Sequence, residues 1–172
     1  MKKKMEISGP HRWLTGAEID LCQSVFGDAI NYQSVRIFNR KWWLFHPCRV
    51  TMAPDGNIWF HPQSGLFRDD YGNADLNLQG LFIHEMVHVW QHQQGVFLPL
   101  ARHPFCRYDY DLISGKPFAD YGIEQQAEIV RHDFLLKQGA QLKNGFQPAQ
   151  FAGLLPFVTP EESPSDKETS LV

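Results

Sequence analysis

The sequence has little cysteine and no spacing of cysteines that is typical of a disulfide framework. Its 172 residues include three cysteines, which are Cys22, Cys48 and Cys106. An odd number of cysteines without any Cys-x-x-Cys pair indicates free thiols. We therefore expect the fold to depend on an apolar core, and a chain with 43% apolar and 13% aromatic residues can build one.

Long apolar runs are also missing. No stretch approaches the ~18–20 apolar residues that a transmembrane helix requires, so we expect no membrane span. Residues 2–4 are lysines and resemble the start of a signal peptide, but Glu6 and Pro10 interrupt the region where its apolar segment would follow. We expect a protein that lacks a signal peptide and is cytoplasmic when it is synthesised.

Basic clusters are equally scarce. The formal net charge is -3 at pH 7, and the short run at residues 2–4 is not a basic block, so we expect no nucleic-acid partner. The length suits one domain, which we assign to residues 1–158. Proline, serine and charged residues dominate after that point, so we expect residues 159–172 to form a disordered tail.

Capping and turn signals divide the first half of the chain. A Thr-x-x-Glu capping box at residues 15–18 predicts the start of a helix that Gly27 would end. Between residues 32 and 60, alternation of apolar and polar residues around a turn at residues 54–57 predicts two or three short strands, which we expect to be antiparallel. Three tryptophans of this region are expected in the core or in a cleft wall: Trp42, Trp43 and Trp59.

Two longer helices are predicted in the second half. The first, from about residue 76 to 94 and capped by Asp75 or Asn77, is apolar nearly all round, which is typical of a buried central helix. The second spans about residues 121–138. Residues 108–112 alternate like a short strand, and residues 147–158 predict a short helix or an apolar strap. The pattern indicates an α+β fold in which a small antiparallel sheet packs on the buried helix.

The buried helix carries the motif His84-Glu85-x-x-His88. Residues four apart lie on the same face of a helix, so His84 and His88 can direct two imidazole nitrogens at one point about 2 Å from each, as zinc requires. Glu85 lies beside that point and can act as general base toward a zinc-activated water. The pattern therefore predicts one zinc ion per chain. The alternative is a buried helix with two hydrogen-bonded histidines and no metal.

A catalytic zinc site needs a third protein ligand. His92 continues the spacing, but it lies two turns from His84, about 11–12 Å along the helix axis, which is too far to share the ion. The long metzincin motif is absent, because Gln91 and Gln94 stand where that motif has glycine and histidine. The third ligand is therefore expected from another part of the chain.

Two glutamates one turn apart near the start of the second helix are the candidates. One carboxylate can bind the metal while the other orients a ligand histidine through its second nitrogen. We assign Glu124 as the ligand and Glu128 as the orienting residue. The reverse assignment is one alternative, and a pair of solvated acids at a helix N-terminus is another.

Four stretches, in this order, resemble the zincin-like metallopeptidases that are associated with Rhs and Vgr proteins of bacterial type VI secretion. They lie at residues 14–32, 52–58, 82–91 and 115–128. The resemblance implies a zincin-like fold, zinc at His84, His88 and Glu124, and Glu85 as the base. It favours Glu124 over Glu128, because the run Glu124-Gln125-Gln126-Ala127 is similar to the downstream motif of that family.

The residues and the resemblance together predict hydrolysis of peptide bonds in a peptide or protein substrate. Two alternatives are a zinc amidase that acts on cell-wall peptide and a non-catalytic spike-accessory protein with structural zinc. The resemblance also implies delivery by a type VI secretion system, with a secretion spike or an immunity protein as partners. The strand at residues 57–60 is a candidate edge for substrate pairing.

A peptidase of this kind needs a donor for the oxyanion of the tetrahedral intermediate. Hydroxyl and imidazole groups near the second helix are the candidates, and the sequence does not choose among them: Tyr108, Tyr110, Tyr121 and His103.

Overall fold

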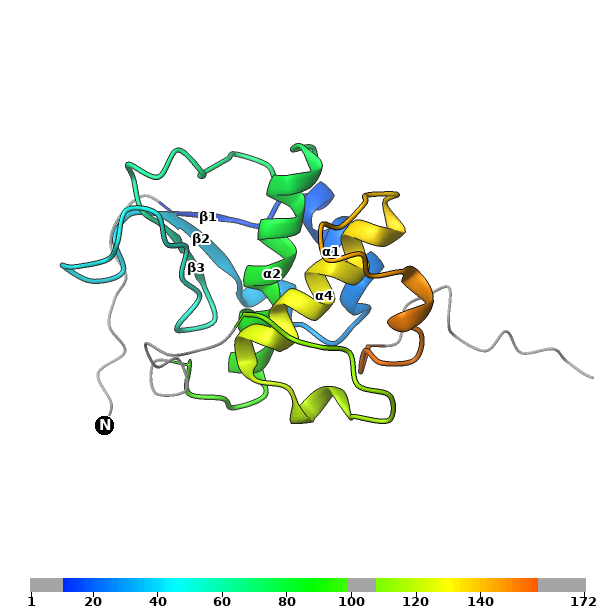
Figure 1. Cartoon of the computed structure of the whole chain (residues 1–172). Helices are drawn as coiled ribbons and strands as arrows, with labels where there is room; N and C mark the ends of the chain where they lie inside the picture. The colour runs from blue at the N-terminus through cyan, green and yellow to red at the C-terminus, as the bar shows by residue number, and fades with distance from the viewer. Residues whose placement is uncertain (1–10, 99–107, 158–172) are drawn as a thin grey trace, which may run out of the picture.

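The computed structural model describes residues 11–98 and 108–157 (Figure 1). In chain order, its strands and helices are β1 (His11–Trp13), α1 (Gly16–Phe26), β2 (Arg36–Asn39), β3 (Ile58–Phe60), α2 (Leu76–Gln93) and α4 (Ile123–Lys137). Short 3-10 helices lie at Tyr32–Ser34, Phe118–Asp120 and Pro148–Gln150. The predicted α+β class is confirmed. The expected tail at residues 159–172 lies outside the described residues.

Within the described ranges, no helix is long and apolar enough to cross a membrane. The longest helix, α2, has 18 residues. Its sequence includes asparagine, glutamine, histidine and glutamate among the apolar residues.

The sheet is mixed, so the prediction of an antiparallel sheet was wrong. Its strand order is β1-β2-β3, with β1 antiparallel to β2 and β2 parallel to β3. β1 lies at one edge of the sheet and was not predicted from the sequence. Residues 42–45, within the region where two or three strands were expected, form a bend and a turn instead. The parallel pairing arises because the long loop of residues 40–57 carries the chain back to the start of the sheet before β3 begins.

The turn predicted at residues 54–57 is present and explains the local pairing of β3. It brings Met52 beside Trp59 in an antiparallel bridge, with N···O distances of 3.1 and 2.8 Å. These two hydrogen bonds use the outward-facing backbone groups of Trp59. The edge of β3 that we considered for substrate pairing is therefore occupied at its centre by Met52.

Helix α1 begins with the predicted capping box. The Thr15 hydroxyl accepts a hydrogen bond from the Glu18 backbone N–H at 3.1 Å, and Glu18 Oε2 accepts one from the Thr15 N–H at 2.9 Å. Glu18 is fully buried. Its carboxylate also accepts two hydrogen bonds from Arg12, at 2.8 and 2.7 Å, and one from the Tyr71 N–H at 2.8 Å. This one side chain therefore joins α1 to β1 and to the loop before α2.

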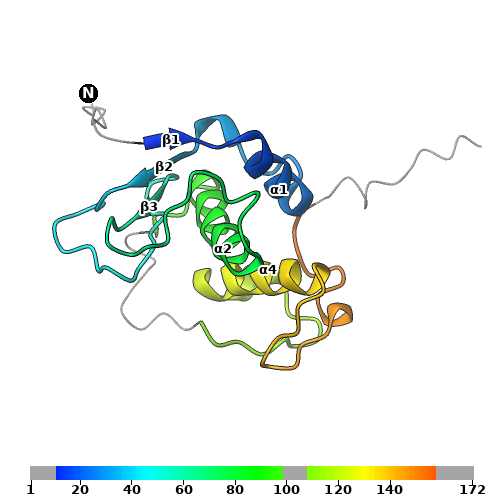
Figure 2. The same ribbon diagram turned by 90° about the horizontal axis from the view of Figure 1, so that it is seen from above.

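Helix α2 is the centre of the fold, as its apolar sequence predicted. Asp75 caps its N-terminus, because the Asp75 carboxylate accepts hydrogen bonds from the backbone N–H groups of Asn77 and Leu78. The sheet lies on one side of α2 and α4 crosses the other (Figures 1 and 2). Gly80 lies where α4 approaches α2 closely: a Cβ atom there would lie 3.1 Å from Leu135 Cδ2, a tight contact to which the leucine side chain would have to adjust. A column of stacked rings, Phe60, Tyr71 and Phe82, joins the sheet to α2.

The segments on either side of α4 differ in how far they match the prediction. Residues 108–112 form no strand, so the strand predicted there was wrong. The apolar strap predicted at residues 147–158 is confirmed over its described part. Phe151 and Phe157 are buried in it, and Phe157 contacts Phe26 and Trp90 edge-on.

Candidate metal centre

The motif residues lie on the buried part of α2, and α4 places a carboxylate against them. His84, Glu85, His88 and Glu124 are all buried. Helix geometry presents His84 and His88 on one face, because they are four residues apart. Glu124 comes from the first turn of α4, where that helix crosses α2. Two helices separated by a long connection thus bring the predicted ligands together.

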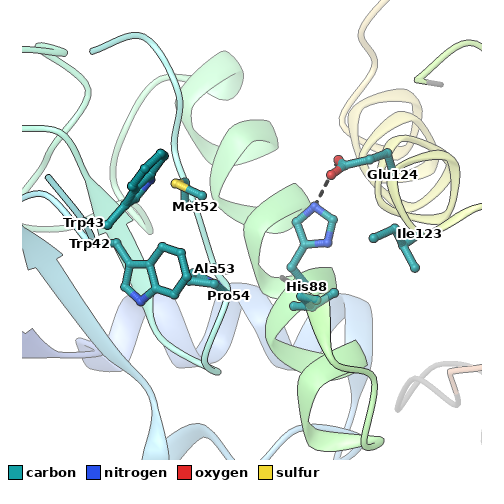
Figure 3. A pocket seen from close by; sticks show the side chains of 9 residues that line it. Trp42, Trp43, Met52, Ala53, Pro54, His88, Ile123 and Glu124 are labelled. Carbon is teal, nitrogen blue, oxygen red and sulfur yellow. Dashed lines mark hydrogen bonds and ion pairs between the residues drawn. The ribbon is translucent and has the colours of Figure 1, made fainter. Parts of the chain in front are cut away.

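The distances between the three side chains match a metal site. Glu124 Oε2 lies 3.2 Å from His88 Nε2 and 3.4 Å from His84 Nε2. One ligand atom from each residue can be chosen so that all three lie within 4.8 Å of one another. Two ligands of a tetrahedral zinc, each about 2.0–2.1 Å from the ion, are about 3.3 Å apart. The buried His2Glu donor set therefore fits zinc in chemistry and in spacing. Figure 3 shows Glu124 facing the His88 ring.

Both histidines are held through the nitrogen that faces away from Glu124. His88 Nδ1 lies 2.8 Å from Gln91 Oε1, and the Gln91 amide donates to Ile123 O at 3.0 Å and to Gln126 Oε1 at 2.9 Å. With Nδ1 carrying the proton, Nε2 of His88 presents its lone pair toward Glu124. This role of Gln91 was not predicted from the sequence. The available signal was a polar residue in an apolar helix, three positions after His88 and so on the same face of α2.

Glu128 holds the other histidine. Its Oε1 lies 2.8 Å from His84 Nδ1 and 3.2 Å from Arg131 Nη1. Glu124 thus lies between the two imidazole Nε2 atoms, and Glu128 lies on the other side of the His84 ring.

The carboxylates around His84 raise its pKa. Burial lowers the pKa of His84, but Glu124 and Glu128 together raise it to about 9. Burial raises the pKa of Glu128, but His84 and the nearby Arg131 outweigh burial and lower it to about 2. Without a metal, the site therefore favours a protonated His84. A cation at the site would replace that proton and satisfy the same carboxylates.

Glu85 is a buried carboxylate with an unsatisfied oxygen. Among the described residues, no group forms a hydrogen bond to Glu85 Oε2. Buried polar atoms without partners are rare in native proteins, and they concentrate where a ligand or a catalytic role explains them. His92, one turn beyond His88, instead packs against the turn at Gly56, where a Cβ atom would lie 2.7 Å from its Cδ2.

The candidate oxyanion donors lie in different surroundings. The Tyr108 ring stacks on His84, with ring centroids 6.4 Å apart. The Tyr110 hydroxyl lies 2.6 Å from His132 Nδ1. The Tyr121 hydroxyl bonds to the backbone of residues 111 and 113. Tyr108 is therefore the candidate with a ring contact to a motif histidine. His103 lies outside the described residues.

A cavity of about 150 Å³ opens beside the metal centre. His88 and Glu124 form part of its wall, and the loop that follows β2 forms the opposite part (Figure 3). Trp42 and Trp43 line it, whereas Trp59 is buried against Phe38 in a stacked pair. Each of the three tryptophans therefore lies in the core or in a cavity wall, as expected.

Comparison with known proteins identifies relatives of this chain. No protein-family model matches it. Over 153 residues, or 84% of its length, the chain is 40% identical to the type VI secretion system spike protein VgrG2b of Pseudomonas aeruginosa, of which the match covers 15%. It also matches the solved effector domain of P. aeruginosa VgrG2b with a TM-score of 0.70 and 38% identity, covering 85% of this chain and 84% of that one. The chain belongs to the family of the VgrG2b effector domain.

Membership of the VgrG2b effector-domain family confirms the Vgr-related part of the resemblance seen in the sequence. The similarity extends over most of the chain and over most of the effector domain. In contrast, the chain spans only 15% of the length of the spike protein. The likeness is therefore to the effector domain of VgrG2b.

Proposed function

We propose that this chain is a zinc-dependent metallopeptidase and a type VI secretion effector. The observation that carries the proposal is the position of Glu124 Oε2, 3.2 and 3.4 Å from the Nε2 atoms of His88 and His84 in a buried site. A buried carboxylate between two imidazoles needs a positive charge to balance it, and a divalent cation supplies one. The effector role is supported by similarity to the VgrG2b effector domain.

The proposed roles follow from the donors and their supports. When bound, a zinc ion would lower the pKa of a water molecule toward ~7 and polarise the scissile carbonyl. Glu85 accepts the proton of the attacking water and passes it to the leaving amine. Gln91 and Glu128 keep the Nε2 atoms of the two histidines directed at the site. Tyr108, stacked on His84, is the candidate donor to the oxyanion.

A catalytic site is favoured over a structural one. Structural zinc has four protein ligands, whereas the donor group in the described part of the chain contains three. A structural site also needs no base, yet Glu85 holds an unsatisfied buried carboxylate oxygen next to His84. These two observations argue against a spike-accessory protein whose zinc only supports the fold.

The amidase alternative would use the same metal site on a different substrate. The cavity beside the site bears on this choice, because its wall is built mainly from apolar and aromatic side chains. Such a wall favours a large apolar side chain over small or charged groups. We therefore propose a peptide or protein substrate. A spike or an immunity protein as a binding partner stays a prediction.

The variant Glu85→Gln tests the mechanism. We expect it to bind one zinc ion per chain and to lose hydrolysis by at least ~10²-fold, because removal of a general base typically costs 10²–10⁴-fold. Elemental analysis after metal-replete purification and a peptide-cleavage assay measure the two properties. Glu124→Gln is the matched variant and should lose zinc as well as activity. Full activity of Glu85→Gln, or a wild-type protein without zinc, would contradict the proposal.

A further inference from the structure

We propose that the cavity beside the metal centre is a specificity pocket that binds an aromatic or large aliphatic side chain of the substrate. The side chain would belong to a residue next to the scissile bond. This inference rests on the proposed metallopeptidase function, which it extends by naming the preferred substrate class.

The position of the cavity links it to the bond that is cut. His88 and Glu124, two of the proposed zinc ligands, form one part of its wall. Trp42, Trp43 and Met52 form the opposite part, as Figure 3 shows. A side chain in this cavity would therefore contact the ligands directly, so its backbone must lie within about one residue of the reacting carbonyl.

The volume of the cavity sets the size of the group that fits. At about 150 Å³, it matches an apolar protein cavity of the size that binds a benzene ring. A methyl group would leave most of this volume unfilled and would lose the van der Waals contacts that the walls offer. A phenyl ring or a branched aliphatic chain is therefore the best match.

The chemistry of the wall excludes charged side chains. Among the residues that line the cavity, only His88 and Glu124 carry ionisable groups, and both are engaged at the metal centre. A lysine, arginine or aspartate side chain would lose its hydration in the cavity without gaining an opposite charge or a full set of hydrogen bonds. Aromatic groups instead gain ring contacts with the two tryptophans.

The aromatic wall is held in place by the sheet and by its own loop. Met52 is hydrogen-bonded to Trp59 in β3 through both its backbone N–H and its carbonyl oxygen. The Trp42 N–H donates to His46 Nδ1 at 3.2 Å, and His46 Nε2 lies 2.6 Å from Val50 O. The wall is thus preorganised, which reduces the entropy lost when a side chain binds. Trp43 is 47% exposed and marks the open side of the cavity.

Two hydroxamates of different size test the pocket without depending on catalysis. Zinc-loaded protein is titrated with acetohydroxamate and with 3-phenylpropionohydroxamate, which share the metal-binding group and differ in the apolar tail. We expect the phenyl compound to bind at least tenfold tighter than acetohydroxamate. Trp42→Ala and Trp43→Ala should each weaken binding of the phenyl compound, and so remove most of this tenfold preference, while the affinity for acetohydroxamate stays the same. Leu44→Ala is the matched control, because Leu44 lies on the same loop but is 76% exposed and does not line the cavity.

The outcomes separate the two proposals. If zinc binds and both compounds bind the wild-type protein with equal affinity, the pocket inference is overturned while the metal site stands. If the protein retains no zinc, or zinc-loaded protein binds neither compound, the proposed function itself fails. The ratio of the two hydroxamate affinities is measured on the wild-type protein, so it tests the inference even if a tryptophan variant does not fold.

Discussion

At the scale of single residues, the positions of the two motif histidines depend on neighbouring side chains that contact their imidazole rings. Gln91 connects His88 to α4, because its carbonyl oxygen accepts from the His88 ring and its amide donates to Ile123 O and Gln126. Glu128 holds His84 in a similar way from α4. Each histidine therefore has a polar partner at Nδ1 that helps to direct Nε2 toward Glu124, and such support raises the affinity of a metal site.

The role of Gln91 can be measured directly. Gln91→Leu keeps the approximate volume but removes the acceptor for His88 Nδ1, so we expect zinc affinity to fall by about 10–100-fold. Competition with a chromophoric chelator measures the dissociation constant. The control is Gln94→Leu, since Gln94 is exposed at the end of α2. Equal affinity in Gln91→Leu and the wild-type protein would show that the hydrogen bond does not support the ligand.

At the scale of secondary-structure elements, Glu18 connects three of them. Its buried carboxylate accepts hydrogen bonds from Arg12 in β1, from Thr15 at the N-terminus of α1 and from Tyr71 before α2. The close packing of Gly72 on Ala17 follows, because a Cβ atom at Gly72 would lie 2.6 Å from the Ala17 carbonyl oxygen. The loop that starts α2 is thereby positioned by α1.

Removal of this carboxylate should destabilise the fold. Glu18→Ala leaves the Arg12 guanidinium and two backbone N–H groups without their acceptor, so we expect a loss of about 3 kcal/mol in the free energy of unfolding. This is at the lower end for a broken buried ion pair, because the Arg12 side chain is 20% exposed. Urea denaturation measures the change, and Asp20→Ala on the exposed side of α1 is the control. A loss no larger than that of the control would refute the structural role.

At the scale of the whole molecule, the candidate metal site lies where the two long helices meet. α2 supplies the two histidines and α4 supplies Glu124, so an ion at this site would cross-link helices whose sequences are separated by 29 residues between their ends. The same crossing brings the sheet and the tryptophan loop to the other side of the site. Activity and stability are thus expected to respond together to the metal.

Metal removal tests this coupling. A ligand that binds only the folded state at 100 times its dissociation constant adds about 2.7 kcal/mol to the free energy of unfolding. For a chain of this length that corresponds to a rise of about 5–10 °C in Tm. We therefore expect chelation to lower Tm by this amount and added zinc to restore it. Glu124→Gln should be insensitive to both treatments; a wild-type Tm that is unchanged by zinc would contradict the coupling.

Local sequence patterns determined the parts of this protein that depend on short-range geometry. The four-residue spacing of His84 and His88 puts them on one face of any helix, and the capping residues at 15–18 and at Asp75 specify where α1 and α2 begin. These signals act within one helical turn, so they can be recognised from the local sequence without knowing the contacts made by the rest of the chain.

Only the tertiary structure decided the parts that depend on contacts between distant segments. The parallel pairing of β2 and β3 follows from the path of the 40–57 loop, which no local pattern encodes. The place of Gln91 between His88 and α4, and the meeting of Trp42 with Glu124 across one cavity, exist because α2 and α4 cross where Gly80 permits it. Strand direction, ligand support and pocket shape are set by packing, which acts between residues far apart in sequence.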